Sequence, residues 1–106
     1  MTDRRIADIN AALGDARGGQ AALWDYMASL AQLTIRITWR GTSANVHLVC
    51  NGCTRLEASM GWDDVNLEFQ ETQSGEMLLT DERSRFLVRC ARIRVFRDVY
   101  PKYLVE

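Results

Sequence analysis

The residues best suited to chemistry in this chain are three cysteines and one histidine. Cys50-Asn51-Gly52-Cys53 is a Cys-x-x-Cys motif, His47 precedes it closely, and Cys90 is the third cysteine. Two thiolates on a tight turn form half of a structural zinc site, and zinc usually takes four Cys or His ligands. Cys50, Cys53, Cys90 and His47 are therefore the candidate metal site, with zinc as the alternative to a chain without a cofactor.

The strand pattern around the motif argues for a second interpretation. Asn-Gly between two strands predicts a β-hairpin, and a redox pair would instead place one thiol at a helix N-terminus. If the loop is Cys50-Asn51-Gly52, Val49 faces Cys53, and His47 points to the opposite face from Cys50. The cysteines are then small buried residues. Their odd number, with no apolar signal segment after Met1, favours free thiols in a cytoplasmic protein.

Charge is balanced overall but divided along the chain. The 13 basic and 14 acidic residues exclude a nucleic-acid binder that relies on bulk positive charge. Eight acids and no basic residue lie between Leu56 and Glu82, whereas six arginines and no acid lie between Arg83 and Arg97. Such arginines either pair with acidic strands across a sheet or recognise a partner's carboxylates. With exposed aromatic residues, they give these candidate partner-binding residues: Arg89, Arg92, Arg94, Trp62 and Tyr100.

Helical periodicity dominates residues 2–31. Ile6, Ile9 and Leu13 form one apolar stripe, and Gly14 is a suitable helix stop. Leu23, Met27 and Leu30 repeat at similar spacing, which predicts a second helix over residues 20–31.

Residues 33–99 follow the two-residue period of β-strands. The apolar positions change parity around Cys90-Ala91-Arg92, which predicts a bulge or sharp bend there. The strand patterns cover residues 33–40, 46–50, 53–58, 65–69, 77–79, 86–90 and 93–95.

These elements predict one α+β domain over residues 1–106. One or two N-terminal helices would pack on a curved antiparallel sheet of six to seven strands, followed by a short C-terminal tail. No apolar run reaches the length of a membrane span, so no membrane partner is expected.

The residues favour a binding protein over an enzyme. No nucleophile, base and orienting acid share a recognisable motif, and the predicted hairpin makes His47 an outward strand residue beside Arg55. The preferred hypothesis is a small protein-binding or adaptor module, of the kind that inhibits a toxin or enzyme. Its exposed sheet face would bind another protein or a second copy in a homodimer. The alternatives are a zinc-binding domain and a small-ligand carrier or enzyme, with a pocket between helices and sheet lined by His47.

Overall fold

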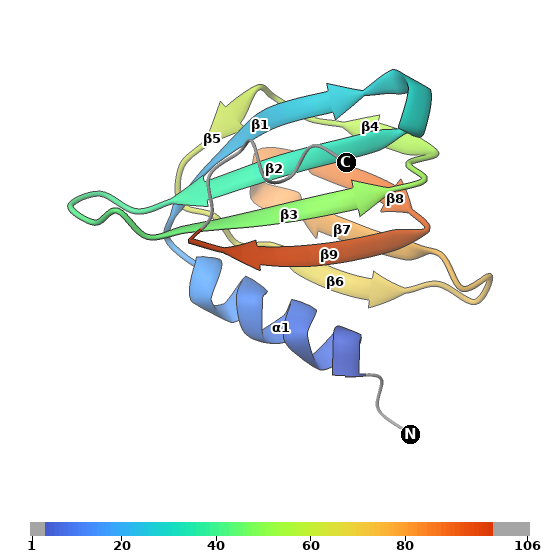
Figure 1. Ribbon diagram of the computed structural model, residues 1–106, viewed down its shortest axis with the longest axis horizontal. Helices are drawn as coiled ribbons and strands as arrows, with labels where there is room; N and C mark the ends of the chain where they lie inside the picture. Colours follow the sequence, from blue (N-terminus) through green and yellow to red (C-terminus); the bar gives the residue numbers. More distant parts are fainter. Residues whose placement is uncertain (1–3, 99–106) are drawn as a thin grey trace.

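The computed structural model describes residues 4–98, which form one α-helix and nine strands in two antiparallel sheets (Figure 1). The predicted α+β class is confirmed, but the single sheet of six to seven strands is replaced by two sheets. The helix α1 (Arg4–Ala16) precedes all the strands. The larger sheet has five strands in the spatial order β5 (Gly61–Trp62), β1 (Gln20–Met27), β2 (Gln32–Thr38), β3 (Asn45–Asn51) and β9 (Arg92–Arg97).

The second sheet lies behind the first in Figure 1 and has four strands. Two short 3-10 turns, η1 (Ala28–Leu30) and η2 (Glu82–Ser84), connect β1 to β2 and β7 to β8. The spatial order of the second sheet is β4 (Arg55–Glu57), β8 (Phe86–Cys90), β7 (Met77–Asp81) and β6 (Glu68–Glu71).

The hydrophobic core fills the space between the sheets and beneath α1. Burial of this apolar surface is the main force that holds the two layers together. The core residues are Ile9, Ala12, Leu13 and Ala16 from α1; Ala21, Leu33, Ile35, Ile37, Val46, Leu48, Cys50 and Ile93 from the larger sheet; Leu79, Phe86, Val88 and Cys90 from the smaller; and Val65 and Leu67 from a loop.

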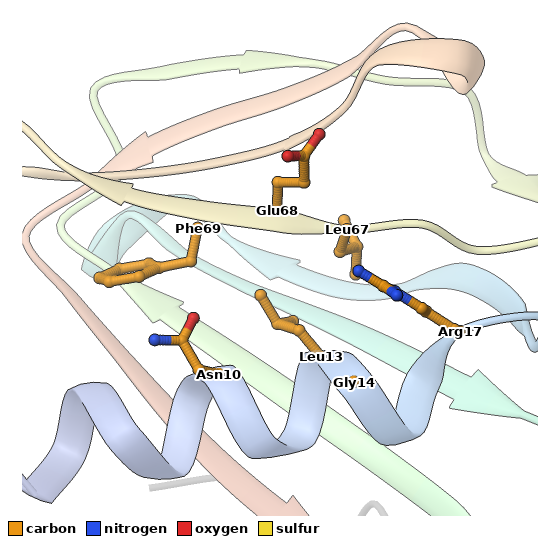
Figure 2. A pocket seen from close by; sticks show the side chains of 7 residues that line it. All are labelled: Asn10, Leu13, Gly14, Arg17, Leu67, Glu68 and Phe69. Atoms are coloured by element: carbon orange, nitrogen blue, oxygen red, sulfur yellow. The ribbon is translucent and has the colours of Figure 1, made fainter.

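The first predicted helix is confirmed, although it continues through Gly14 to Ala16. Gly18, with φ of 78°, supplies the left-handed turn that follows it. α1 contacts β9 and β6, the edge strands on one side of the two sheets, and so covers the opening between them (Figure 1). Figure 2 shows Leu13 of α1 pointing toward Leu67, beside an open groove of about 220 Å³.

The second predicted helix is wrong, because residues 20–27 form strand β1. Ala21 and Leu23 face Ile37 and Ile35 of β2 in the ladder, and β5 pairs on the other side of Ala21. Pairing with two strands outweighs the good helix propensity of this segment, which contains no β-branched residue.

The predicted hairpin at Asn51-Gly52 is also wrong. β3 pairs with β2 and β9, whereas β4 pairs with β8 in the other sheet, so Val49 does not face Cys53. Gly52 takes a φ of 67° and turns the chain from one sheet to the other. Asn-Gly thus provides the left-handed turn, but the strand that follows it leaves the sheet.

The predicted bend near Ala91 is confirmed in a stronger form. β8 ends at Cys90 in the smaller sheet, and β9 begins at Arg92 in the larger sheet. The change of parity in the apolar pattern therefore marks a strand that switches sheets, as occurs at the corners of packed sheets. The Ala91 amide donates a 2.9 Å hydrogen bond to the Asn51 carbonyl, so the two crossings touch.

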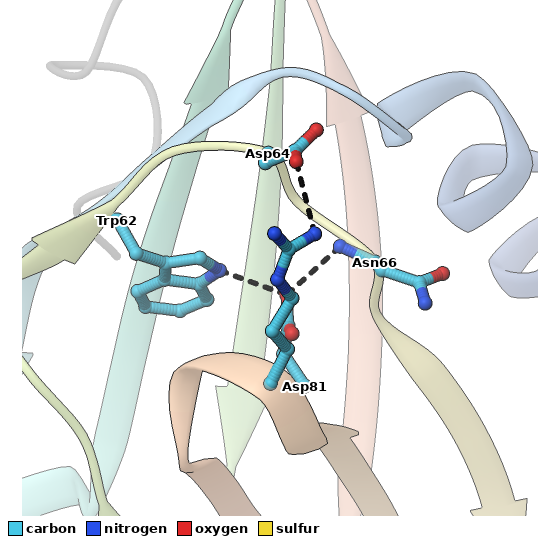
Figure 3. Close-up of polar contacts among 5 residues, drawn as sticks. Trp62, Asp64, Asn66 and Asp81 are labelled. Carbon is cyan, nitrogen blue, oxygen red and sulfur yellow. Dashed lines mark hydrogen bonds and ion pairs between the residues drawn. The ribbon is translucent and has the colours of Figure 1, made fainter.

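A buried carboxylate fixes the segment between β5 and β6. Oδ2 of Asp81 accepts hydrogen bonds of 2.9 Å from Trp62 Nε1 and 2.8 Å from the backbone N–H of Asn66 (Figure 3). Only the far end of the predicted 65–69 strand joins β6; Val65 instead exchanges backbone hydrogen bonds with Gly18 and Gly19.

Substituting Gly52 by Ala tests the crossing. The Cβ added at position 52 would lie 3.0 Å from the Ala91 Cβ, and the backbone there has a positive φ. Gly75→Ala is the matched control, because Gly75 has φ of 88° and no atom within 4 Å of the added Cβ. We expect Gly75→Ala to lose about 1–2 kcal/mol of unfolding free energy from backbone strain. Gly52→Ala should lose about 1–3 kcal/mol more from overpacking. Equal losses in urea denaturation would contradict a tight contact between the crossings.

Candidate functional site

The candidate site lies on the side of the five-stranded sheet that faces away from the core. Side chains alternate along each strand, so the neighbours of the core residues Ile35, Leu48 and Ile93 point outward. We call this surface the outer face, and define it by Trp24, Thr34, Arg36, His47, Val49, Arg94 and Phe96.

A β-bulge displays Trp24 at the border of the outer face. In the β1–β2 ladder Leu23 pairs with Ile35 and Asp25 pairs with Thr34, which leaves Trp24 as the extra residue. Bulges re-aim side chains and are common beside functional sites. Trp24 is 44% exposed, a large value for an indole ring in the middle of a strand.

Trp24, Arg36 and His47 form a stack across β1, β2 and β3. The Arg36 guanidinium carbon lies 4.5 Å from the centre of the Trp24 ring, in a cation–π contact. The Trp24 and His47 rings meet edge to face, with centroids 6.4 Å apart. Because Arg36 and His47 are direct partners in the ladder, the three side chains form one cluster.

Three buried polar atoms of this cluster lack hydrogen-bond partners. His47 is fully buried although it points outward, and neither Nδ1 nor Nε2 has a partner. Arg36 Nε is likewise buried and unpaired. Burial and the nearby Arg36 charge both lower the pKa of His47 from its ordinary value of 6.5. His47 is therefore held as a neutral imidazole beside a cation.

The opposite end of the outer face is a satisfied polar network. Arg94 Nε donates to Asn51 Oδ1 over 3.1 Å, and the side-chain Nδ2 of Asn51 donates to Gln32 Oε1 over 2.7 Å. Gln32 Oε1 also lies 3.4 Å from Arg94 Nη2. Arg94 thus joins β9 to β2 and β3, and its guanidinium lies 5.6 Å from the Phe96 ring centre.

The three cysteines come together at the corner where the chain crosses between sheets, and all are free thiols. Cys50 and Cys90 are fully buried and share a hydrogen bond, while Cys53 is half-buried and lies 3.3 Å from the Cys50 carbonyl. The hydrogen bond to Cys90 and burial raise the pKa of Cys50, and burial raises that of Cys53. The same hydrogen bond lowers the pKa of Cys90, whose side chain is fully buried. Cys50 and Cys53 are protonated at neutral pH, unlike the activated thiolates of redox enzymes.

The proposed fourth metal ligand does not join them. His47 lies on the outer face, whereas Cys50 belongs to the core, so the two side chains leave β3 in opposite directions. Across residues 4–98 no three His, Cys, Asp or Glu side chains are arranged to hold a metal ion. Nor does His47 line the space between α1 and the sheets, where a ligand carrier would place it.

The predicted partner-binding residues divide between different surfaces. Arg92 and Arg94 lie on the larger sheet, but Arg89 belongs to β8 of the other sheet, so the arginines form no single stripe. Trp62 is part of the interior, with its ring 4.8 Å from Phe86 and its Nε1 bonded to Asp81. Tyr100 lies outside the described residues.

Within residues 4–98, one ion pair joins the acidic segment to the basic one, Arg83 with Asp64 at 3.1 Å. Arg97 pairs instead with Asp15 of α1 at 2.9 Å. Both pairs are largely exposed, and such pairs contribute about 0–1 kcal/mol each. Ion pairing between the two segments therefore adds little to the stability of the fold.

Sequence reasoning missed Trp24 and Arg36. Trp24 falls within the predicted helix over residues 20–31, and nothing in the strand pattern over residues 33–40 distinguishes Arg36 from its neighbours. The alternation of Arg36 and His47 with core residues was visible, but their partnership depends on the β2–β3 register.

Comparison of the chain with protein-family models, with curated proteins and with solved structures finds no match. The helix of the described region is too short and too polar to cross a bilayer. The function must therefore be argued from the geometry.

The pH dependence of stability tests the neutral, buried state of His47. Because its folded pKa lies below 6.5, the unfolded chain binds more protons as pH falls, and acidification destabilises the fold. We expect the unfolding free energy to fall between about pH 6.5 and 5, by no more than about 1.4 kcal/mol per pH unit.

His47 is the chain's one histidine, so His47→Leu is the control and should remove this slope. Denaturant titrations at several pH values measure it. A slope of opposite sign, or one that persists in His47→Leu, would contradict the assignment.

Thiol reactivity tests the cysteine corner. A thiol reagent needs access and a thiolate. Cys50 and Cys90 are fully buried and Cys53 is half-buried, so we expect Cys53 to react first in the native chain. All three should react in denaturant. Cys53→Ser should abolish the native reaction. Three thiols that react at one rate in the folded chain would show that the corner is open.

Proposed function

We propose that this chain is a non-catalytic protein-binding module, and that its outer face is the binding surface. The observation that carries the proposal is the Trp24–Arg36–His47 cluster, an exposed indole stacked with a cation above a buried histidine whose nitrogens have no partners. Trp and Arg are enriched among residues that dominate binding energy at protein interfaces.

The geometry supports binding better than catalysis. A general base needs a substrate proton within reach and is usually oriented by another group. His47 has no hydrogen bond to orient it, and its cross-strand neighbours are Arg36 and Phe96. The raised pKa values of Cys50 and Cys53 disfavour nucleophilic use of these two thiols. The pKa of Cys90 is lowered by its hydrogen bond to Cys50, but its side chain is fully buried and out of reach of a substrate.

Charge complementarity indicates the chemistry of the partner. Arg36 and Arg94 point outward from β2 and β9, and Arg92 extends the same surface with its side chain exposed. Asp25 is the acidic residue that the bulge brings to this side. The surplus of arginine favours a partner that presents acidic side chains.

Capture of a partner by matched variants tests the proposal. Proteins are retrieved from an extract of the source organism's cells with three baits: the intact chain, Trp24→Ser and Met60→Ser. Met60, 79% exposed and outside the outer face, is the control for loss of an exposed apolar side chain. We expect a stoichiometric partner that Met60→Ser retains and Trp24→Ser binds about 30-fold more weakly, the loss typical of an interface hot spot.

Two results would overturn the proposal. A chain that is monomeric by light scattering and retrieves no stoichiometric partner does not act as a binding module. A partner that Trp24→Ser retains at full affinity uses a surface other than the outer face.

A further inference from the structure

The outer face holds three hydrogen-bonding atoms that nothing in the described chain satisfies. They are Nε of Arg36 and the two ring nitrogens of His47, and all are buried. Folded proteins pair nearly all such atoms, because burying one without a partner is costly. The same strand pair contains fully satisfied groups at its other end, where Gln32 and Asn51 bond to each other and to Arg94. One further buried atom without a partner, Oδ1 of Asp81, lies in the other sheet, whereas Arg36 and His47 gather three such atoms on neighbouring side chains.

We propose that Arg36 and His47 together bind a carboxylate from an acidic side chain of the partner; this rests on the proposed function of the outer face. The two residues are direct cross-strand partners, so their side chains leave the sheet side by side. A carboxylate has two oxygens. One accepts the Nε–H of Arg36 and the other accepts an N–H of His47, which satisfies both buried donors at once.

The surroundings select a carboxylate over larger anions. Trp24 borders Arg36 and His47 on one side, Phe96 faces His47 across the β3–β9 ladder, and Val49 lies next along β3. A phosphate would place further charged oxygens against these apolar side chains, where they would lose their hydration without new donors. A neutral amide would gain less, because hydrogen bonds with an ionised partner are stronger.

Trp24 controls access to the pair. Its ring covers the Arg36 guanidinium and meets the edge of His47, and it is itself 44% exposed. Because Trp24 is partly exposed and lies outside the core, its side chain can adopt another rotamer without moving a core residue. The incoming carboxylate takes the place of the indole edge over His47, and the indole then packs on the partner's apolar surface.

Binding is coupled to the charge of His47. The charged group directly opposite it is Arg36 of β2; Arg94 of β9 and Asp25 of β1 lie on the same face but pair with Val49 and Thr34. Without a ligand, burial and the Arg36 charge disfavour a protonated imidazole. A bound carboxylate reverses this, so affinity increases as pH falls toward 6.

Two synthetic peptides test the inference by titration calorimetry on the full chain. The probe is acetyl-Leu-Ala-Glu-Ala-Leu-amide, and the matched peptide carries glutamine in place of glutamate. At about pH 6 and low salt, we expect the glutamate peptide to bind at least about tenfold more tightly, the value of one charge-assisted hydrogen bond. Arg36→Gln should reduce this preference to none.

Three further variants separate specific recognition from general charge and from misfolding. Arg36→Lys keeps the charge but not the guanidinium Nε–H, so it should lose most of the preference. Arg89→Gln removes the same charge as Arg36→Gln from the other sheet and should keep the preference. His47→Leu should lose the preference while melting at the same or a higher temperature than the parent chain, because it removes two unpaired buried nitrogens.

Equal or undetectable binding of the two peptides by the parent chain would overturn the inference, as would a preference that survives in Arg36→Gln. These outcomes are distinct from failure of the proposed function. If a captured partner needs Trp24 but the two peptides bind equally, the chain is a binding module whose partner is not recognised through a carboxylate. If the glutamate peptide is preferred but no partner is captured, the anion site is real and the protein-binding function is not.

Discussion

The fold depends on one point of contact, where two of the four crossings between the sheets meet. The hydrogen bond from the Ala91 amide to the Asn51 carbonyl joins the crossing from β3 to β4 with that from β8 to β9. Both crossings must lie at the same corner, because β3 and β9 are neighbours in one sheet and β4 and β8 are neighbours in the other. Gly52 allows this close approach, and Cys50 and Cys90 fill the space behind it.

This corner fixes the register from which the outer face is built. With Asn51 opposite Arg92, the β3–β9 ladder places His47 opposite Phe96 and lets Arg94 reach Asn51. The β2–β3 ladder then sets Arg36 beside His47. A shift of one residue in either ladder would exchange the faces of a strand and send His47 into the core. The chemistry of the outer face is thus a consequence of strand register rather than of any local motif.

The sequence predicted those features that depend on neighbouring residues along the chain. The alternation of Leu33, Ile35 and Ile37 placed β2 and its inward face correctly, and the parity change near Ala91 located a true bend. The error at residues 20–27 arose because strand pairing decided a segment whose own propensity is helical. Asn51-Gly52 correctly indicated a turn after β3, but no local signal shows that the next strand pairs in another sheet.

In the candidate site too, spacing along the sequence was a poor guide to which side chains meet across strands. Spacing in the sequence brought Cys50 and Cys53 together and suggested His47 as their companion, but the pleat of β3 separates the thiols from the imidazole. Trp24 and Arg36 lie far from His47 in the chain and meet it through two ladders and a bulge. Arg89, Arg92 and Arg94 share an arginine-rich stretch, yet the sheet crossing places Arg89 on a different layer from the other two.

In the free chain His47 is a buried neutral imidazole whose ring nitrogens have no hydrogen-bond partner. The most direct measurement is an NMR titration of the His47 ring nitrogens, first in the free chain and then with the glutamate-bearing peptide at saturation. We expect a pKa below 6.5 in the free chain, because burial and Arg36 disfavour the cation, and a higher pKa in the complex. A free-chain pKa at or above 6.5, or one that the peptide leaves unchanged, would contradict the central claim.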